Sequence, residues 1–355
     1  MRLERRPTTS RTALVLAPLG AIAFTLAISA LLVLWAGAPV GRTYALLLQG
    51  GFGSVFAWSE TLTRATPLIL TGLSAAIAFR ARLFNIGAEG QLYAGALAAV
   101  AVGGMHGGGE GFALAPWLLL PLALAAAAVA GALLLLGPAL LKRRLGVDEV
   151  VTTLLLNFIV LLGVSALLDG PMKDPSAMGW PQSVSLQGAL ELGKLIPQTR
   201  VHTGLLGAMA LAVAAWVVMR HTVAGFDLRA VGANARAAEF AGVPVTRTVV
   251  MVALLSGALA GLAGAIEVAG RTSYVTLDMS PGYGYTGIVI AMLAGLHPLG
   301  VIAAGVFVAG VLVGADTMSR AVGVPTYIAD VIVAASLIAV LVATLLTQYR
   351  VRVTK

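Results

Sequence analysis

Apolar stretches long enough to cross a lipid bilayer recur along the whole of this 355-residue chain. A hydrocarbon core about 30 Å thick requires about 20 apolar residues of a helix, and only helices or closed barrels satisfy their backbone groups there. The stretches have helical length, so we predict an all-α integral membrane protein. About ten spans are expected, over residues 13–35, 62–79, 86–102, 117–141, 150–168, 203–219, 248–268, 284–296, 299–315 and 327–347.

The balance of residue types excludes an ordinary soluble protein. Hydrophobic residues make up 59% of the chain and charged residues 11%, whereas about 25% of the residues in soluble domains are charged. The formal net charge of +8 could indicate nucleic-acid binding, but the basic residues lie between the apolar stretches. If both termini are cytoplasmic, 16 Lys and Arg residues face the cytoplasm and 7 face the other side. This asymmetry follows the positive-inside rule, so we expect cytoplasmic termini and no nucleic-acid partner.

The chain is expected to form one transmembrane domain over residues 13–348. A basic leader, 1–12, precedes it, and a short cytoplasmic tail, 349–355, follows. The first apolar stretch exceeds the length of about 7 to 15 residues of a signal-peptide core, so we expect it to be retained as a helix. A polar, proline-containing stretch over 169–202 is expected to be an extracytoplasmic loop with a short helix, and 220–247 to be cytoplasmic.

The third and eighth predicted spans are short and begin with glycines at the same spacing. The small residues are Gly87, Gly90 and Ala94 in the first half of the chain and Gly284, Gly287 and Ala291 in the second. Paired, glycine-interrupted segments in two halves of a chain indicate a transporter binding site, because broken helices expose backbone groups at the middle of the membrane. A two-half pseudo-repeat and a chance match in a chain with 42 glycines both remain open.

Polar side chains enter the third span. Phe84 and Asn85 precede it, and Glu89 and Gln91 lie in its first turns. An unpaired Glu in hydrocarbon costs several kcal/mol, so Glu89 must be paired, protonated or directed into a hydrated cavity. Two interpretations follow: these residues line a solute pathway, or they cap and hold a re-entrant helix.

A second polar group opens the fifth span. Asp148 and Glu149 lie in the first turn, where the helix dipole favours carboxylates. Asn157 lies deeper, on the same face as Thr153, and its amide needs either a neighbouring helix or a solute as partner.

Signatures of enzymes and of bound cofactors are missing from the sequence. No Gly-x-x-x-x-Gly-Lys-Ser/Thr phosphate loop occurs, so ATP hydrolysis by this chain is not expected. The Gly-x-Gly-x-x-Gly pattern that starts at Gly282 opens an apolar span and follows no predicted strand, which argues against dinucleotide binding. The chain has no cysteine, and its four histidines, His106, His202, His221 and His297, are scattered over loops without metal-ligand spacing. We therefore expect no metal, no cofactor and no catalytic residue.

The cytoplasmic stretch over residues 225–243 is too polar to span the membrane yet rich in helix-forming residues. It ends at Gly242, with Pro244 beyond, which is typical of a helix end. A short amphipathic helix here would either lie on the lipid surface or dock into a partner protein.

In combination, these motifs resemble those of one protein family. The segments are 84–91, 148–157, 232–242, 282–285 and 297–300. The chain from about Pro67 to Gln348 is similar to permease subunits of ATP-binding-cassette importers, in the superfamily of ribose and branched-chain amino acid permeases. The Asn-Ile-Gly-Ala-Glu-Gly-Gln string resembles the nucleoside or simple-sugar branch, which is served by basic-membrane-protein lipoproteins.

The resemblance implies a ten-helix permease of the bacterial inner membrane, with three kinds of partner. These are a second permease subunit, which suggests a heterodimer, a cytoplasmic ATPase that uses the ATP, and an extracytoplasmic substrate-binding lipoprotein. The coupling helix that contacts the ATPase would lie between Gly232 and Gly242. Its expected contact residues are Gly232, Asn234, Arg236, Ala237, Ala238, Glu239 and Gly242.

The solute expected from the resemblance is a nucleoside, carried by alternating access. Aromatic side chains would stack on the base and amides would bind its ring and ribose groups. The expected pathway residues are Phe84, Asn85, Glu89, Gln91, Thr153, Asn157, Tyr283 and Tyr285. A simple sugar such as a pentose is the alternative solute. A stand-alone channel or a membrane-embedded enzyme is the alternative of another class, and it would work without an ATPase.

Overall fold

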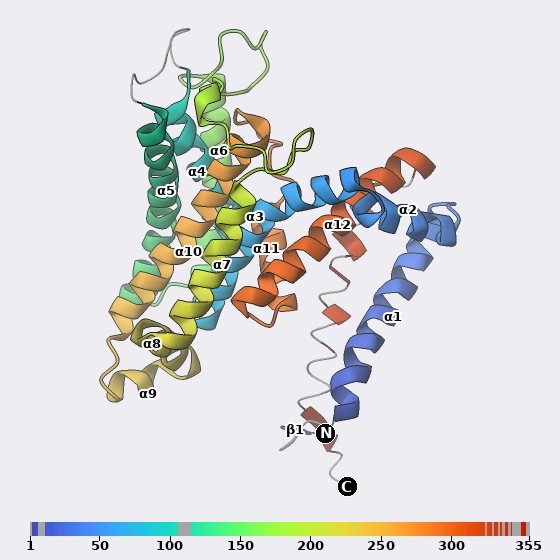
Figure 1. Ribbon diagram of the computed structural model, residues 1–355. Helices are drawn as coiled ribbons and strands as arrows, with labels where there is room; N and C mark the ends of the chain where they lie inside the picture. The colour runs from blue at the N-terminus through green and yellow to red at the C-terminus, as the bar shows by residue number, and fades with distance from the viewer. Residues whose placement is uncertain are drawn as a thin grey trace. The chain divides into compact units, whose positions relative to one another are not determined.

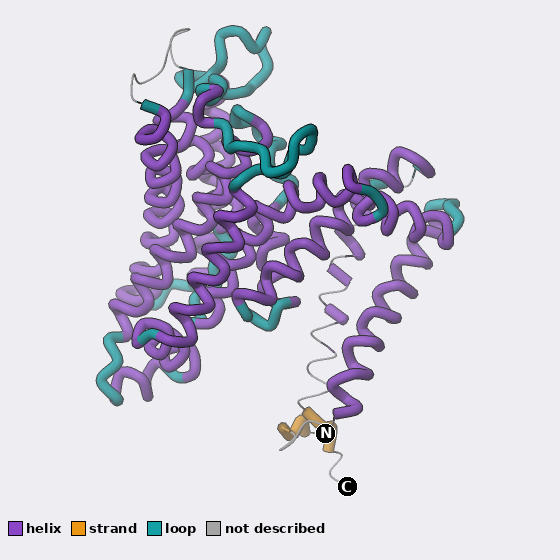
Figure 2. The backbone as a smooth tube through the Cα atoms, in the orientation of Figure 1, coloured by secondary structure: helices purple, strands orange, loops and turns teal. Residues whose placement is uncertain are grey.

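The computed structural model describes residues 2–5, 11–105, 115–323, short pieces of 325–342, and 349–352. Helices dominate these residues (Figures 1 and 2). The last predicted span, 327–347, is described only in fragments, and His106 lies outside the described residues. The chain divides into two compact units, residues 1–61 with 308–355 and residues 62–307. Whether both belong to one transmembrane domain stays a prediction.

The first unit is built from the two ends of the chain. It contains β1 (Arg2–Arg5), α1 (Arg11–Trp35), α2 (Val40–Phe52), the start of α3 (Val55–Arg80), the second part of α12 (Pro298–Val322) and β2 (Tyr349–Arg352). The two short strands pair antiparallel. The sequence analysis predicted no helix where α2 lies, and α2 turns away from α1 by 114°.

Small residues hold α2 against the second part of α12. A Cβ atom at Gly51 would overlap the carbonyl oxygen of Gly310, and one at Gly314 would overlap that of Leu47. Such close backbone approach is the usual way helices associate where lipid supplies no hydrophobic driving force.

The second unit contains most of α3 and the helices up to the first turns of α12. These are α4 (Ala88–Gly103), α5 (Pro116–Leu145), α6 (Glu149–Asp169), η2 (Gly188–Leu190), α7 (Gly204–His221), α8 (Val223–Ala233), α9 (Ala235–Phe240), α10 (Val245–Glu267), η3 (Val268–Thr272) and α11 (Tyr283–Leu293). Figure 1 shows the loop between α6 and α7 at one end of this unit and α8 with α9 at the other end.

Six helices of the described residues are long and apolar enough to cross a membrane, and α1 with α2 would add a seventh if the bent pair is one span. The protein is therefore a helical, multi-pass membrane protein, as predicted. The helices α4 and α11, which correspond to the third and eighth predicted spans, are 16 and 11 residues long.

The centre of the second unit is formed by α4, α5 and α10. Glycines pair across these helices: a Cβ atom at Gly95 would overlap Gly261, and one at Gly131 would overlap Gly257. An alanine cluster of Ala99, Ala123, Ala127 and Ala265 fills the space beside them. Because the interior is made of small side chains, the three backbones approach closely and position the residues described next.

Candidate functional site

The connection between α3 and α4 returns into the interior and is held there by a pair of amides. The Asn85 side chain is fully buried and exchanges two hydrogen bonds with Gln91, each 2.9 Å long. Asn85 Nδ2 also donates to Ser256 Oγ of α10 at 3.1 Å. These contacts fit the interpretation that both residues hold a re-entrant helix, and their contact with a solute stays a prediction.

Two polar residues of α6 bind the same connection. Thr153 Oγ1 accepts a hydrogen bond from Ile86 N at 3.2 Å. The buried Asn157 accepts from Gly90 N and donates to Ile86 O, both at 2.8 Å, and it donates to the Tyr285 hydroxyl at 3.1 Å. Asn157 thus joins three helices, α6, α4 and α11, which is the contact between helices considered for it from the sequence.

Glu89 joins the first turns of α4 and α11. Its Oε2 accepts a hydrogen bond from Gly284 N at 2.6 Å, and its side chain is 97% buried. A Cβ atom at Gly284 would overlap Glu89 N, so the two helix ends touch through their backbones. The short, glycine-led helices that the sequence paired therefore meet at their N-terminal ends, where the helix dipoles favour a carboxyl group.

The aromatic residues of the predicted pathway differ in exposure. Tyr283 is buried, whereas Phe84 and Tyr285 keep 42% and 38% of their surface exposed. Phe84 packs edge-to-face on Phe79, with ring centres 5.2 Å apart. Of the eight predicted pathway residues, Phe84 and Tyr285 are therefore the ones that present surface outside the folded chain.

A charged cluster beside Tyr283 was missed by the sequence analysis. Glu267 is fully buried at the end of α10, and Arg271 donates to it at 2.6 Å and to the Tyr283 hydroxyl at 3.0 Å. The two side chains meet because the helix continues beyond Glu267 as the π-helical turn η3, which is a feature often found at functional sites. The acid and base at this spacing were the available signal, but Arg271 was assigned to a loop.

His202 lies in the loop before α7 and is buried. Its ring faces Gly270, and neither ring nitrogen has a hydrogen-bond partner in the part of the chain that the structure describes. Burial disfavours the charged imidazole and lowers the pKa of His202 to about 4.

The predicted coupling helix is two short helices, α8 and α9, joined at one residue. Asn234 ends α8, and its side chain caps α9 by accepting from Ala237 N at 3.1 Å. Gly232 packs directly on the end of α3, because a Cβ atom there would overlap the Arg80 carbonyl oxygen. Gly242 adopts a φ of +86°, which ends α9.

Side chains on α9 divide between an inner and an outer face. Ala238 is buried, whereas Arg236, Ala237 and Glu239 are exposed, and Glu239 pairs with Arg143 of α5 at 3.1 Å. Phe240 is 97% exposed, although it is a large apolar residue. The sequence analysis did not select Phe240, because its exposure depends on where the helix ends.

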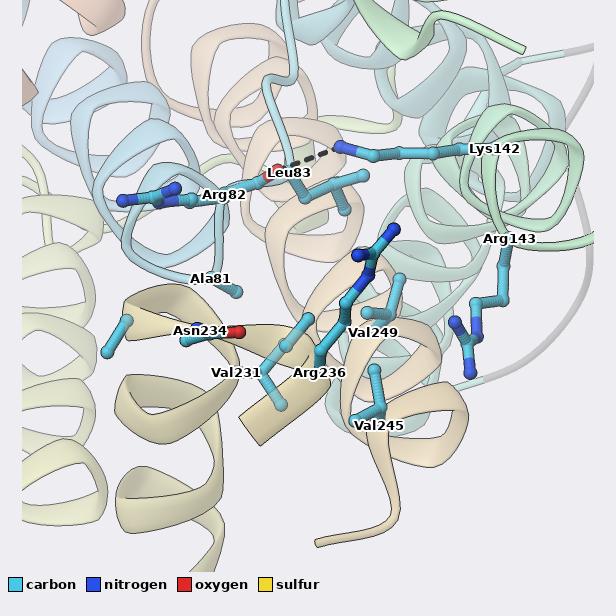
Figure 3. Close-up of a pocket in the computed structure, with 12 residues that line it drawn as sticks. Ala81, Arg82, Leu83, Lys142, Arg143, Val231, Asn234, Arg236, Val245 and Val249 are labelled. Carbon is cyan, nitrogen blue, oxygen red and sulfur yellow. Dashed lines mark hydrogen bonds between the residues drawn. The ribbon is translucent and has the colours of Figure 1, made fainter. Parts of the chain in front are cut away.

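A cavity of about 500 Å³ lies between α8–α9 and the adjacent ends of α3, α5 and α10 (Figure 3). Lys142 borders it, donates to Arg82 O at 2.9 Å and forms an ion pair with Glu149. Glu149 in turn accepts from Phe84 N at 3.1 Å. The same ion pair therefore fixes both the wall of the cavity and the start of the α3–α4 connection.

Comparison with known proteins identifies the family. Residues 57–341 match the protein family described as the permease component of branched-chain amino acid transport systems. The chain is 38% identical to the guanosine ABC transporter permease protein NupP of Bacillus subtilis, over 90% of this chain and 91% of that one. It is 38% identical to the glucose ABC transporter permease protein TsgB13 of Haloferax volcanii (87% and 82%) and 31% identical to the nucleoside ABC transporter permease protein NupB of Lactococcus lactis (92% and 90%). With its apolar helices and short α8–α9 pair, the chain belongs to this family of transport-system permease components.

Proposed function

We propose that this chain is one of two permease subunits of an ATP-binding-cassette importer and that its solute is a nucleoside. The similarity to the guanosine and nucleoside permeases, which extends over about nine tenths of both chains, is the observation that carries the proposal. The chain would perform no covalent chemistry, and ATP would be bound and hydrolysed by a partner ATPase. We place it in a bacterial inner membrane, with ten spans and both termini in the cytoplasm.

The second permease subunit is proposed to be a different, related chain. The chain is also similar to the guanosine ABC transporter permease protein NupQ of Bacillus subtilis, at 30% identity. It is 28% identical to the nucleoside ABC transporter permease protein NupC of Lactococcus lactis. Two distinct permeases with the same described solute in each organism favour a heterodimer over a homodimer.

Force from the ATPase would enter at α9. The exposed Phe240 offers an apolar anchor of the kind that aromatic residues supply at protein interfaces. From there the contacts run through Gly232 to the end of α3 and into the α3–α4 connection. The connection contacts Asn157 of α6 through Ile86, and the first turn of α4 that follows it contacts α11 through Glu89. A shift of α8–α9 would thus reach the two short helices where the solute is expected to pass.

Nucleoside recognition would use both aromatic and polar groups. Phe84 and Tyr285 have exposed rings that could stack on a base, and the Tyr285 hydroxyl is oriented by Asn157. A sugar remains the second candidate solute, because the similarity to the Haloferax glucose permease has the same identity as that to NupP.

Two experiments separate these proposals. Purification of the native complex in mild detergent should retain an ATPase subunit, and a preparation without one would overturn the importer proposal. The binding lipoprotein that co-purifies should gain thermal stability from guanosine or uridine and show no change with ribose or glucose. Protection by the sugars alone would leave the importer intact and reassign its solute.

A further inference from the structure

The loop between α6 and α7 binds η3 and the residue that follows it. Leu192 N donates a hydrogen bond to Ala269 O of η3 at 2.8 Å. Beside it, the Glu191 carboxylate accepts a hydrogen bond from Ser273 Oγ at 3.0 Å. Ser273 ends the π turn, where its own N–H donates to Val268 O at 2.9 Å. The loop is therefore bonded both within the turn and at its end.

The same loop pairs with the chain that leads from η3 toward α11. Leu186 N donates to Ser273 O at 2.7 Å, and Ser183 N donates to Val275 O at 3.0 Å. Ser183 Oγ also accepts from Val275 N at 2.8 Å, and both residues are fully buried. Because these bonds extend over residues 269–275, a displacement of the loop would move this stretch of backbone with it.

The last residues of the loop pack directly on η3. His202 is buried, and its ring lies against Gly270 of the turn. A Cβ atom at Gly270 would lie 2.5 Å from the ring atoms Cε1 and Nε2 of His202, so a larger residue would not fit there. Since a close-packed contact has little room to deform, it transmits a displacement of the loop to η3 instead of absorbing it.

Arg271 connects the same turn to the start of α11. Its Nη1 atom donates to Glu267 Oε1 at 2.6 Å and to the Tyr283 hydroxyl at 3.0 Å. Glu267 and Tyr283 are both buried. Tyr283 is the first residue of α11, directly before Gly284, whose N–H donates to Glu89 of α4. Arg271 therefore lies one hydrogen bond away from the helix end that meets α4.

We propose that Arg271 is a positioning residue, through which the α6–α7 loop sets the place of the first turn of α11. A shift of the loop moves η3, Arg271 moves with that turn, and the Tyr283 hydroxyl follows the guanidinium. The contact between Gly284 and Glu89 then changes, at the two short helices where the solute is expected to pass. A π turn at this place agrees with the frequent occurrence of such turns at functional sites.

The partner that would shift the loop follows from the proposed function, on which this part of the inference rests. Figure 1 shows the loop at the end of the second unit opposite α8 and α9. Since the ATPase is proposed to bind α9, the loop lies on the side from which an importer takes its solute. A substrate-binding lipoprotein would therefore be the protein that contacts it.

Hydrogen exchange followed by mass spectrometry tests the connection in the full complex, placed in lipid nanodiscs. The readout is the exchange rate of the amides over residues 283–286. Ser183→Ala removes a bond between the loop and the chain after η3, and Arg271→Gln removes the guanidinium. Ser176→Ala is the matched control, because the Ser176 hydroxyl bonds to Asp174 within the loop.

Ser183→Ala should raise the exchange rate about threefold or more and Arg271→Gln about tenfold or more, whereas Ser176→Ala should change it less than about twofold. Adding Ser183→Ala to Arg271→Gln should give no further increase, because the loop acts on α11 through the guanidinium that is already absent. Arg271→Lys should restore the wild-type rate, since one ammonium can replace both bonds of Nη1. A wild-type rate for Ser183→Ala, or a full additive increase in the double variant, would overturn the inference.

If Arg271→Gln does not give a folded complex, Tyr283→Phe replaces it in this cycle, because it removes only the hydroxyl that accepts from Arg271. A second readout is ATP hydrolysis with the lipoprotein present. Arg271→Gln should keep basal hydrolysis and lipoprotein affinity within about twofold and reduce the stimulation by solute-loaded lipoprotein about fivefold or more. A parallel fall of basal and stimulated hydrolysis would show a merely structural role and contradict the inference. A complex without an ATPase would refute the proposed function, while the exchange rates would still decide the role of Arg271.

Discussion

Replacing Gly284 by Ala should separate the ends of α4 and α11 and unfold the protein at a lower temperature. The added Cβ atom would overlap Glu89 N and lie 2.6 Å from both Ala88 C and Glu89 Cα. To restore a contact distance of about 3.5 Å between the new Cβ atom and these backbone atoms, the two helix ends would have to move apart by about 1 Å. The hydrogen bond from Gly284 N to Glu89, now 2.6 Å, would then lengthen beyond bonding distance.

The magnitude follows from these two effects. Forcing a methyl group into a packed interior costs about 1–3 kcal/mol, and leaving a buried N–H without its acceptor costs about 1–3 kcal/mol. We therefore expect a loss of about 2–6 kcal/mol in the free energy of unfolding. Gly207→Ala in α7 is the matched control, because no atom lies within 4 Å of its Cβ position. There the better helix propensity of alanine should leave stability unchanged or raise it by up to about 1 kcal/mol.

Thermal unfolding of the purified complex, followed by tryptophan fluorescence, measures both variants. The chain has five tryptophans and no cysteine, so a thiol-reactive dye would report nothing from this subunit. Solute uptake into vesicles should fall for Gly284→Ala and stay unchanged for Gly207→Ala. If Gly284→Ala melts at or above the wild-type temperature, the close contact of the two helices does not exist as described.

Three further outcomes are expected. Asn157→Ala should destabilise the protein by about 1–3 kcal/mol, since it removes three hydrogen bonds and such bonds contribute about 0.6 kcal/mol each in membranes; an unchanged melting temperature would contradict this. Phe240→Ala should reduce co-purification of the ATPase while Arg229→Ala does not, and equal retention would remove Phe240 from the interface. The pKa of His202 is about 4 in the folded protein and about 6.5 in the unfolded chain. The contribution of the buried neutral imidazole to stability is therefore complete above about pH 6.5. Below that pH the unfolded chain binds a proton that the folded protein does not, so the free energy of unfolding falls by up to about 1.4 kcal/mol per pH unit as the pH drops toward about 4. His202→Leu should flatten the dependence of melting temperature on pH in that window, and parallel curves for both proteins would refute the assignment.

Much of the helical framework was predictable because apolar length is a direct physical requirement of the bilayer. The predicted span over 150–168 corresponds to α6 at Glu149–Asp169, and that over 117–141 to α5 at Pro116–Leu145. The helix α2 was missed because Arg42, Gln49 and its glycines make it less apolar than a span, while its stability comes from contacts with α12. The residues in these contacts, such as Gly51 and Gly310, lie more than 250 positions apart, so local sequence does not reveal them.

The candidate site, like the helical framework, was predictable from the sequence only in part. Sequence reasoning identified Asn157 as an amide that needs a partner, but its partners Gly90 and Tyr285 lie 67 and 128 positions away. The ion pair of Glu267 and Arg271 was missed because the span was taken to end before Arg271, whereas the helix continues as a π turn. From the sequence alone, an arginine in a loop cannot be distinguished from one in a buried helical turn, because the residue at which the helix ends is not known.

Asn234 separates α8 from α9 by a single extended residue, with φ −158° and ψ 106°. Two torsion angles connect the helices, yet α9 is held on both sides of this joint. Ala238 is packed with Val231 of α8 and Val245 of α10, and Glu239 pairs with Arg143 of α5. A push on α9 would therefore displace the adjacent ends of α5, α8 and α10 together, because a turn of α9 alone would break these contacts.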